Sequence, residues 1–511
     1  MMKTCALWLV ALTLLFAGCA ALAEEGSPQS TDKEDVTIAV ETLKPLQNHN
    51  PVMVQRFGAD PWAMEYDGRI YLYMTGDDPV LTRSGKPNTN TYSNITTLRV
   101  ISSDDLVNWT DHGSVRAAGK TGAASWAANS WAPCAAWKTI DGQDRFFLYF
   151  ANSAGGIGVL TADAPWGPFT DPLGQALISR GTPTCASVTW LFDPAVLVDD
   201  DGSAYLYFGG GTPDGQAAAP GTARVVKLGE DMISLDGDPV AIDAPWLFED
   251  SGVNKMGDTY VYSYCSNFQV PSAGSEQGFY SGEIVYLTAS SPFGPFTYGG
   301  RALKNPGSYF GVGGNNHHCM FSFRGTWYVT YHAATVDRDR GWNAGYRSTF
   351  VDELALNDQG LLALSRGTYA GVSQLQPFSP YRTVNAATLA TLAGADTRLA
   401  DPQYRDAGSG PMAAFSKEAG GWIAVAGVDF GDAGAAAVTL RWQCGQAAEI
   451  ALVLDDPAGG PAAVLALPGG QAAQEATLLL PQPITGVHDL IFRFDQPQVV
   501  LYTWAFQPVA E

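Results

Sequence analysis

Hydrophobic and aromatic residues recur in five short segments along the greater part of the chain, and each segment follows a turn signal of glycine with aspartate or arginine. Apolar segments bounded in this way are typical of the second strand of a β-hairpin. Hairpins that return at intervals of several tens of residues predict a propeller whose blades are small antiparallel sheets. The five predicted strands cover residues 69–73, 145–149, 203–207, 259–263 and 326–330.

In four of these strands an aromatic residue is preceded, eleven or twelve positions earlier, by an ionisable side chain, and the aromatic residues are Tyr71, Tyr205, Tyr260 and Tyr328. The blades of a propeller surround one central channel, so equivalent positions in their first strands face a common space. The pattern therefore predicts one pocket that gathers three carboxylates and a histidine from distant parts of the chain. These residues are Asp60, Asp193, Glu249 and His317.

A second repeated motif supports this periodicity. Residues 161–170 and 288–297 share the pattern Thr-Ala-x-x-Pro-aromatic-Gly-Pro-Phe-Thr, and residues 102–110 form a looser copy. Each copy follows a hydrophobic segment, which predicts the loop that leads to the outer edge of a blade.

The pattern changes beyond Pro377, where alanine becomes frequent and the aromatic repeat ends. Residues 421–430, 449–454 and 489–494 alternate or remain apolar over lengths typical of strands. The sequence thus predicts an all-β protein with a five-bladed β-propeller at residues 37–374. A β-sandwich of jelly-roll type is predicted at residues 378–511.

Composition narrows the class of partner. The chain has 511 residues, a formal net charge of -22 and 11% aromatic residues. This length allows more than one domain, and the negative charge argues against nucleic acid and anionic membrane surfaces as partners. The five cysteines beyond residue 19 show neither a C-x-x-C pair nor a zinc spacing, so we expect buried thiols.

The N-terminus has the features of an export signal over residues 1–23. Lys3 precedes an apolar run at residues 6–17, which is too short to span a bilayer. Residues 21–23 form an A-x-A cleavage site, whereas residues 16–19 resemble a bacterial lipobox that ends at Cys19. Two destinations therefore remain open, a secreted extracellular protein or a lipoprotein tethered to the membrane, with residues 24–36 as a polar linker.

The propeller region resembles glycoside hydrolase family 43, whose five-bladed enzymes remove arabinofuranose or xylose from plant hemicellulose. The likeness rests on segments that occur in the order of the family. They are Ala59–Trp62, Trp131–Pro133, Phe192–Ala195 with Asp199–Gly202, Glu249 with Lys255, Asn316–His318 and Tyr346–Arg347.

The C-terminal region resembles carbohydrate-binding module family 6, through residues 427–431, 452–457 and 486–490. It departs from that family around residues 386–392, where an acidic residue is missing, and near residues 469–470, where a tryptophan is missing. Trp422 and Trp504 are the remaining candidate aromatics. Binding of carbohydrate and simple bracing of the propeller are both open readings of this domain.

The family resemblance implies inverting hydrolysis with Asp60 as general base and Glu249 as general acid. It implies that Asp193 orients Glu249 and raises its pKa, since a neighbouring negative charge disfavours ionisation. Inversion predicts Asp60 and Glu249 carboxyls roughly 6.5–9.5 Å apart, with space for a water molecule. The alternative for each acid is a structural turn residue or a solvated loop residue, which is also how we interpret Asp250 and residues 199–201.

The resemblance implies further roles for residues around the acids. Arg347 matches an arginine that contacts the sugar, although a salt-bridged structural arginine is the alternative. Trp62 and Trp131 adjoin the pocket motifs and are candidates for stacking on a sugar or for core packing. His317 matches a histidine that in several members reaches a calcium ion, largely through water, and a core histidine is its alternative. No other cofactor is expected.

The function predicted from the sequence is an exo-acting α-L-arabinofuranosidase, β-xylosidase or both, acting on arabinoxylan-type hemicellulose. The partners expected are plant cell-wall polysaccharides and oligosaccharides, including arabinan and xylo-oligosaccharides. Two alternatives remain, an endo-arabinanase of the same family and a non-catalytic carbohydrate-binding propeller. An invertase-like fructan hydrolase is disfavoured, because Trp62 follows Asp60-Pro61 where that class has Asn-Gly.

Overall fold

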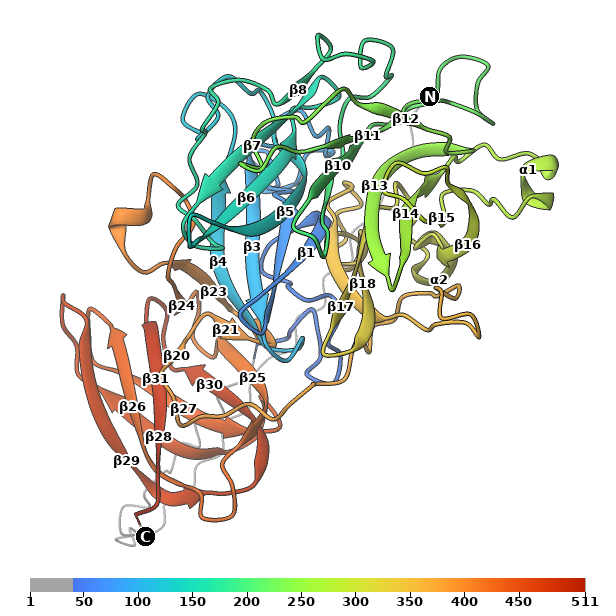
Figure 1. The fold of residues 1–511 in the computed structure, drawn as a ribbon. Coiled ribbons are helices and arrows are strands. Elements are labelled where there is room, and N and C mark those ends of the chain that lie inside the picture. Colours follow the sequence, from blue (N-terminus) through green and yellow to red (C-terminus); the bar gives the residue numbers. More distant parts are fainter. Residues whose placement is uncertain (1–39, 511) are drawn as a thin grey trace, which may run out of the picture. The chain divides into compact units, whose positions relative to one another are not determined.

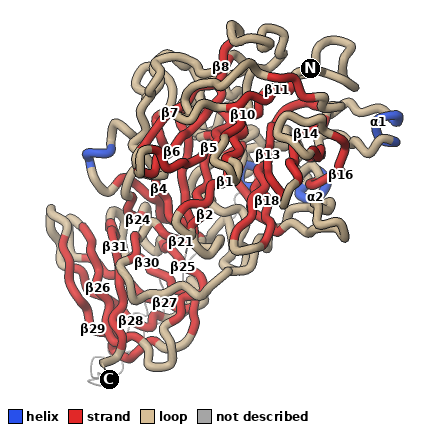
Figure 2. The backbone as a smooth tube through the Cα atoms, viewed as in Figure 1, coloured by secondary structure: helices blue, strands red, loops and turns tan. Residues whose placement is uncertain are grey.

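The computed structural model describes residues 40–510, which fold almost entirely into antiparallel strands (Figures 1 and 2). The predicted export signal, the lipobox at Cys19 and the polar linker lie outside the described residues. Within residues 40–510, none of the helices has the length and hydrophobicity needed to cross a bilayer.

Five antiparallel sheets follow one another in chain order and confirm the predicted five-bladed propeller (Figure 1). Blade 1 contains β1 (Ala59–Tyr66), β2 (Arg69–Thr75), β3 (Thr97–Ser103) and β4 (Trp109–Arg116). Blade 2 contains β5 (Trp131–Ile140), β6 (Gln143–Ala151), β7 (Gly156–Ala162) and β8 (Ile178–Ser179). Blade 3 contains β9 (Ala195–Val198), β10 (Ala204–Phe208), β11 (Ala223–Lys227) and β12 (Val240–Ile242). Blade 4 contains β13 (Leu247–Met256), β14 (Thr259–Ser266), β15 (Ile284–Ala289) and β16 (Thr297–Leu303). Blade 5 contains β17 (His318–Phe323), β18 (Thr326–Ala333) and β19 (Ser348–Glu353).

The first strands of the blades close a ring. Strand β1 contacts β5, β5 contacts β9, β9 contacts β13, β13 contacts β17, and β17 contacts β1. The five predicted hairpin strands are β2, β6, β10, β14 and β18, each paired with the first strand of its blade. These second strands are buried along nearly their whole length, because neighbouring blades cover both faces of each sheet. This explains why their sequences read as continuous apolar runs.

Short helices occur only in connecting segments of blades 4 and 5 and of the C-terminal region, among the described residues. They are α1 (Ser272–Glu276), α2 (Gly307–Phe310), α3 (Thr335–Asp339) and the 3-10 helix η1 (Pro402–Tyr404).

A left-handed residue stands at the same place in four of the five blades, where the chain enters the first strand. The φ angles are 48° at Asp60, 40° at Ala132, 51° at Asp193 and 72° at Asp250. At Asp60, Ala132 and Asp250 the pairing register with the second strand also shifts. Bulges of this kind redirect side chains, so these residues mark the points where the blades face the centre of the ring.

The C-terminal region forms two packed sheets with their own hydrophobic core, which confirms the predicted sandwich. One sheet contains β23 (Ala395–Leu399), β24 (Met412–Ser416), β31 (Val500–Pro508), β26 (Ala435–Gln443) and β29 (Gln474–Ile484), with β20 (Val384–Asn385) paired to β31. The other contains β22 (Thr391–Ala393), β25 (Trp422–Asp429), β30 (Val487–Phe494), β27 (Ala448–Leu454) and β28 (Pro461–Leu467). The three strands predicted from the sequence are β25, β27 and β30.

One short strand of the C-terminal region joins the propeller. Strand β21 (Thr388–Leu389) pairs with β4 and extends the sheet of blade 1. Asn108 of blade 1 also accepts a hydrogen bond from the backbone N–H of Ala426 and donates one to its carbonyl, at 2.8 and 2.9 Å. The division of the chain at residues 374–378 stays a prediction.

Candidate active site

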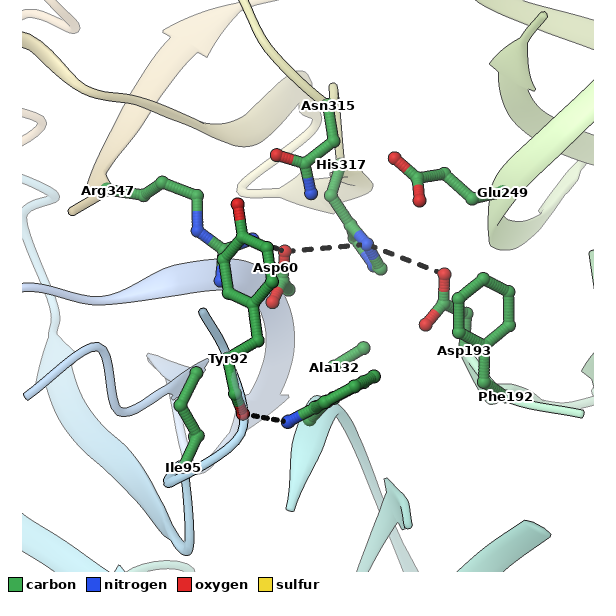
Figure 3. A pocket seen from close by; sticks show the side chains of 11 residues that line it. Asp60, Tyr92, Ile95, Ala132, Phe192, Asp193, Glu249, Asn315, His317 and Arg347 are labelled. Carbon is green, nitrogen blue, oxygen red and sulfur yellow. Dashed lines mark hydrogen bonds and ion pairs between the residues drawn. The ribbon is translucent and has the colours of Figure 1, made fainter. Parts of the chain in front are cut away.

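The structure brings the four residues of the predicted central cluster into one cavity that is open to solvent. Figure 3 shows the carboxyl groups of Asp60, Asp193 and Glu249 directed at a common space, with the ring of His317 between them. The lining residues come from all five blades and their loops. They are Asp60, Tyr92, Ile95, Trp131, Ala132, Phe192, Asp193, Glu249, Asn315, His317 and Arg347.

Asp60 is a buried carboxylate held by a buried arginine. Nη1 of Arg347 donates to Oδ1 of Asp60 at 2.8 Å, while Nε and Nη2 of Arg347 each donate to Asp77 at 2.9 Å. Burial alone would raise the pKa of Asp60, but the positive charge of Arg347, together with smaller effects of His332 and His317, holds this pKa well below its ordinary value. Asp60 is therefore ionised at neutral pH.

The backbone of Asp60 is oriented by His332. The Asp60 N–H donates to Nδ1 of His332 at 3.0 Å, and Nε2 of His332 lies 3.1 Å from the carbonyl oxygen of Asn315. A carbonyl only accepts, so Nε2 carries the proton and His332 is the neutral Nε2–H tautomer. This contact fixes Asp60 in its left-handed conformation from the side of blade 5.

Glu249 has the opposite electrostatic environment. Its Oε1 is buried and has no hydrogen-bond partner among the described residues. Burial, and then the negative charges of Asp60 and Asp250, raise the pKa of Glu249 to about 8 against a partial offset from Arg347. Glu249 is thus protonated at neutral pH, while Asp60 in the same cavity is ionised.

The pKa of Asp193 is raised as well. Its Oδ2 accepts the backbone N–H of Asp250 at 3.0 Å, and it is only 4% exposed. Burial, followed by the charges of Glu249, Asp60 and Asp250, raises the pKa of Asp193 well above its ordinary value. That Asp193 itself raises the pKa of Glu249 stays a prediction, since the causes resolved at Glu249 are burial, Asp60 and Asp250.

His317 lies at the centre of the acidic groups. Its Nδ1 is 3.7 Å from Oδ1 of Asp60 and 3.8 Å from Oδ2 of Asp193, and its Nε2 is 3.2 Å from Oδ1 of Asp250. Within residues 40–510, no group of three or more His, Cys, Asp or Glu side chains is arranged to hold a metal ion. Both ring nitrogens face carboxyl groups of the protein, so the expected calcium contact of His317 finds no support in this arrangement.

Asp250 was interpreted from the sequence as a turn or surface acid, and this is wrong. Its side chain is fully buried. It occupies the left-handed position that Asp60 and Asp193 occupy in their blades, whereas Glu249 stands one residue earlier. Counting back eleven residues from Tyr260 leads to Glu249, whereas counting back twelve from Tyr262, the next aromatic residue of β14, leads to Asp250. The choice of Tyr260 therefore concealed the equivalence of Asp250 with Asp60 and Asp193.

The two tryptophans of the sequence prediction have different positions. Trp131 lines the cavity, and its indole N–H donates to the carbonyl of Tyr92 at 3.0 Å. Trp62 is not among the lining residues; it is 7% exposed, packs in the hydrophobic core and donates to the carbonyl of Ala135 at 2.9 Å. A sugar-stacking role for Trp62 does not fit this position.

Sequence reasoning missed Tyr92, Phe192 and Asp77. The ring centroid of Tyr92 lies 4.8 Å from the guanidinium carbon of Arg347, and Tyr92 has a left-handed φ of 61°. It belongs to the long connection between β2 and β3, which has no periodic pattern to identify it. Phe192 stands directly before Asp193 in the chain, so its proximity to the site was readable from the sequence, whereas Asp77 lies in a loop two residues beyond β2 and no sequence pattern connects it with Arg347.

Comparison with known proteins agrees with this geometry. Residues 48–362 match the model of glycosyl hydrolases family 43. The chain is similar to the arabinoxylan arabinofuranohydrolase of Paenibacillus polymyxa, with 46% identity over 88% of this chain and 72% of the relative. It is 44% identical to the arabinoxylan arabinofuranohydrolase of Bacillus subtilis strain 168, over 88% of this chain and 90% of the relative.

A solved structure extends the likeness to three dimensions. The crystal structure of a family 43 arabinoxylan arabinofuranohydrolase from Bacillus subtilis, in complex with cellotetraose, superposes with a TM-score of 0.86 at 43% identity. The match covers 91% of this chain and 99% of that chain, so it includes the C-terminal sandwich as well as the propeller.

Proposed function

Since this chain belongs to glycosyl hydrolase family 43, we propose that it is an exo-acting α-L-arabinofuranosidase that removes arabinofuranose from arabinoxylan. The observation that carries this proposal is the similarity to two arabinoxylan arabinofuranohydrolases along 88% of the chain. That similarity is far higher than the 31% identity, over 334 residues, to a xylosidase/arabinosidase of Humicola insolens. Arabinofuranose is therefore our first choice of released sugar, ahead of xylose.

The proposed mechanism is inversion in a single displacement. Asp60 is the general base, supported by the adjoining charge of Arg347 that keeps it ionised. Asp60 accepts one proton from water as the water oxygen attacks the anomeric carbon, while Glu249 donates its proton to the departing xylan oxygen. The opposite protonation of two acids in one cavity supports these assignments.

Asp193 has an orienting role in this proposal. The charge of Glu249 raises the pKa of Asp193, so the two carboxyl groups interact. Asp193 also accepts a hydrogen bond from the backbone N–H of Asp250, the residue that follows Glu249. By accepting this N–H, Asp193 holds the bulge of β13 from which the side chain of Glu249 projects. Its loss should displace Glu249 rather than remove a proton from the reaction.

The walls of the cavity suit a single furanose ring. Tyr92, Trp131 and Phe192 provide aromatic surface, and Asn315 and Arg347 provide polar contacts. Apolar walls with a few convergent polar groups are the usual composition of a small-ligand site. We assign two functions to Arg347, contact with the sugar and a structural ion pair, since it lines the cavity and is also paired with Asp60 and Asp77.

The C-terminal sandwich is proposed to brace the propeller. Trp422 and Trp504 are each 1% exposed, so neither offers a ring to a polysaccharide. The pairing of β21 with β4 and the contacts of Asn108 with Ala426 support the bracing role. Binding of the full-length protein to insoluble arabinoxylan, with the catalytic cavity blocked by excess arabinose, distinguishes the roles; retained binding would contradict bracing alone.

We propose export from the cell as the setting of this activity, on the basis of the signal-like residues 1–23. Whether Cys19 is lipidated separates a tethered enzyme from a released one. Metabolic labelling with a fatty acid, compared between the natural chain and Cys19→Ser, answers this.

The experiment for the main proposal is product analysis on four substrates: arabinoxylan, unsubstituted xylan, linear arabinan and xylo-oligosaccharides. We expect free arabinose from arabinoxylan and no shortening of unsubstituted xylan. Release of arabino-oligosaccharides from arabinan would identify an endo-arabinanase, and release of xylose from xylo-oligosaccharides a xylosidase. Binding without turnover on all four would identify a non-catalytic propeller. Glu249→Gln is the matched inactive control.

A further inference from the structure

Asp250 is a buried acid that the proposed mechanism does not use. It is the residue after Glu249 in β13, its side chain is fully buried, and its φ angle is 72°. Left-handed backbone at a residue other than glycine persists only where the surroundings enforce it, and such residues gather at functional sites. The contacts of Asp250 therefore deserve a functional explanation.

One carboxylate oxygen of Asp250 is bound to blade 5. Its Oδ2 accepts the backbone N–H of His318 at 3.1 Å and also pairs with Nδ1 of the same residue. Nε2 of His318 meets the hydroxyl of Ser263 at 2.8 Å, and His318 is itself fully buried. The orientation of the Asp250 carboxyl group is thus fixed by two blades.

The other carboxylate oxygen of Asp250 faces His317. Oδ1 of Asp250 is buried and makes no well-aligned hydrogen bond among the described residues, but it lies 3.2 Å from Nε2 of His317. Burial lowers the pKa of His317, so its ring is neutral and carries one N–H. A buried carboxylate oxygen without a donor is unfavourable, and this draws the single proton to Nε2.

The second ring nitrogen then has a free lone pair. Nδ1 of His317 is 3.7 Å from Oδ1 of Asp60 and 3.8 Å from Oδ2 of Asp193. Both distances exceed those of a hydrogen bond, so Nδ1 and Asp60 are placed to accept from one hydroxyl donor between them. The attacking water is such a donor, and a hydroxyl group of the bound sugar is another.

We infer that Asp250 is a positioning residue that holds His317 with its N–H toward Asp250 and its unprotonated Nδ1 toward Asp60. In this arrangement the water that Asp60 deprotonates gives its second hydrogen bond to Nδ1 of His317. The water is thereby oriented by two acceptors instead of one. This inference rests on the proposed hydrolytic function for its kinetic consequence, whereas the position of the proton on His317 is a property of the free protein.

The test variant is Asp250→Asn, which preserves the size of the side chain. The amide oxygen can still accept from His318, and the amide NH2 then faces Nε2 of His317 and forces the proton onto Nδ1. We expect kcat on arabinoxylan to fall by about 100-fold or more, by analogy with other catalytic sites where Asp→Asn reverses a histidine tautomer. The KM should stay within about twofold if the donor is water. A matching rise in KM identifies a sugar hydroxyl as the donor.

The matched control is Asp352→Asn, which removes another buried carboxylate, bound to Tyr331, Thr368 and Asn50, that does not line the catalytic cavity. It should leave kcat unchanged. A wild-type kcat in folded Asp250→Asn would overturn the inference, as would equal losses in both variants.

A second measurement does not depend on turnover. The chain has only six histidines, so ¹⁵N-histidine labelling resolves their ring nitrogens by NMR, with His317→Gln to assign the signals. We expect Nε2 of His317 to be protonated in the wild type and Nδ1 in Asp250→Asn. A protonated Nδ1 in the wild type refutes the inference even if Asp250→Asn does not fold. Absence of hydrolysis on every substrate would refute the proposed function and leave the NMR result standing.

Discussion

Nη1 of Arg347 donates to Oδ1 of Asp60 at 2.8 Å, and both side chains are almost fully buried, with 7% of each exposed. These two residues lie at opposite ends of the propeller sequence and meet because β1 of blade 1 and the segment before β19 of blade 5 are neighbours where the ring closes. The pair keeps a carboxylate charged in the same cavity in which burial raises the pKa of Glu249 and of Asp193. The contrast between Asp60 and Glu249 depends on this contact.

Removal of the charge of Arg347 should change the acid side of the pH profile. In Arg347→Gln the pKa of Asp60 rises, because burial is no longer opposed by the guanidinium. Asp60 works only when ionised, and so kcat/KM will be lost at a higher pH on acidification than in the wild type. The variant should also lose about 3–5 kcal/mol of stability, since Asp60 and Asp77 remain buried without their partner.

Arg301→Gln is the control for this variant. It removes an arginine that is paired with Glu283 and does not line the cavity. An unchanged acid limb in Arg347→Gln, measured as kcat/KM against pH, would show that Arg347 does not set the protonation of Asp60.

The alkaline side of the profile should report Glu249. Its pKa is raised to about 8, chiefly by burial, and the acid acts only while it holds its proton. Activity should therefore be maintained through neutral pH and decline as the pH rises through about 8. The measurement is kcat/KM on arabinoxylan, whose leaving oxygen needs the proton, from about pH 4 to about pH 10. A decline near the ordinary pKa of a glutamic acid, about 4.3, would contradict the assignment.

The raised pKa of Glu249 should also affect the stability of the protein. The folded protein binds a proton at Glu249 that the unfolded chain has released above its ordinary pKa. Glu249 therefore lowers the free energy of unfolding progressively as the pH rises from about 4.5 toward 8. In Glu249→Gln this contribution is absent, so the variant should be less sensitive to alkaline pH in thermal unfolding.

Glu249→Gln should have unequal effects on different substrates. Its neutral amide cannot protonate a leaving group, so hydrolysis of arabinoxylan should fall by about 10²–10⁴-fold. A nitrophenyl leaving group needs little protonation and should be affected much less. The control is Glu283→Gln, a carboxylate that pairs with Arg301 and does not line the cavity, and it should match the wild type on both substrates. Equal losses on both substrates would argue against Glu249 as the acid.

Asn108 connects blade 1 to the C-terminal sandwich and offers a test of the bracing role. Its side chain is 1% exposed and bonds both the N–H and the carbonyl of Ala426. Asn108→Ala leaves the buried N–H of Ala426 without its partner, whereas the carbonyl keeps the amide of Gln374 as a donor at 3.1 Å, so the change should cost about 1–3 kcal/mol. Denaturant unfolding measures this loss, with Asn94→Ala at an exposed position as control. A loss no greater than that of Asn94→Ala would mean that this contact does not stabilise the two parts together.

The sequence predicted the fold and the cluster of acids because both follow from a repeat. The aromatic second strands identify the blades, and Asp60 and Asp193 lie eleven and twelve residues in front of an aromatic residue in them. The same counting concealed Asp250, since the second strand of its blade has aromatic residues at both 260 and 262. Trp62 stands after the bulge of β1, whereas Trp131 stands before the bulge of β5. Trp62 is buried and Trp131 lines the cavity, and no local sequence pattern indicates this difference.

Electrostatics inside the cavity were the least predictable property. Arg347 and Asp77 lie in loops of different blades and are joined by hydrogen bonds. Neither loop has a periodic sequence from which this contact could be predicted. The raised pKa of Asp193 depends on how deeply four acids are buried together, which is a property of the closed ring. The role of Asp193 as a neighbouring negative charge could therefore be proposed from the sequence, but only the three-dimensional arrangement reveals its protonation.

The most direct test of the account is the configuration of the first sugar released. ¹H NMR of an arabinofuranoside substrate during the first minutes of hydrolysis distinguishes the two anomers before they equilibrate. With Asp60 as base and Glu249 as acid, the account predicts that an α-linked substrate first yields the β anomer of arabinofuranose. Initial formation of the α anomer would contradict it, because retention requires a carboxylate that attacks the sugar directly.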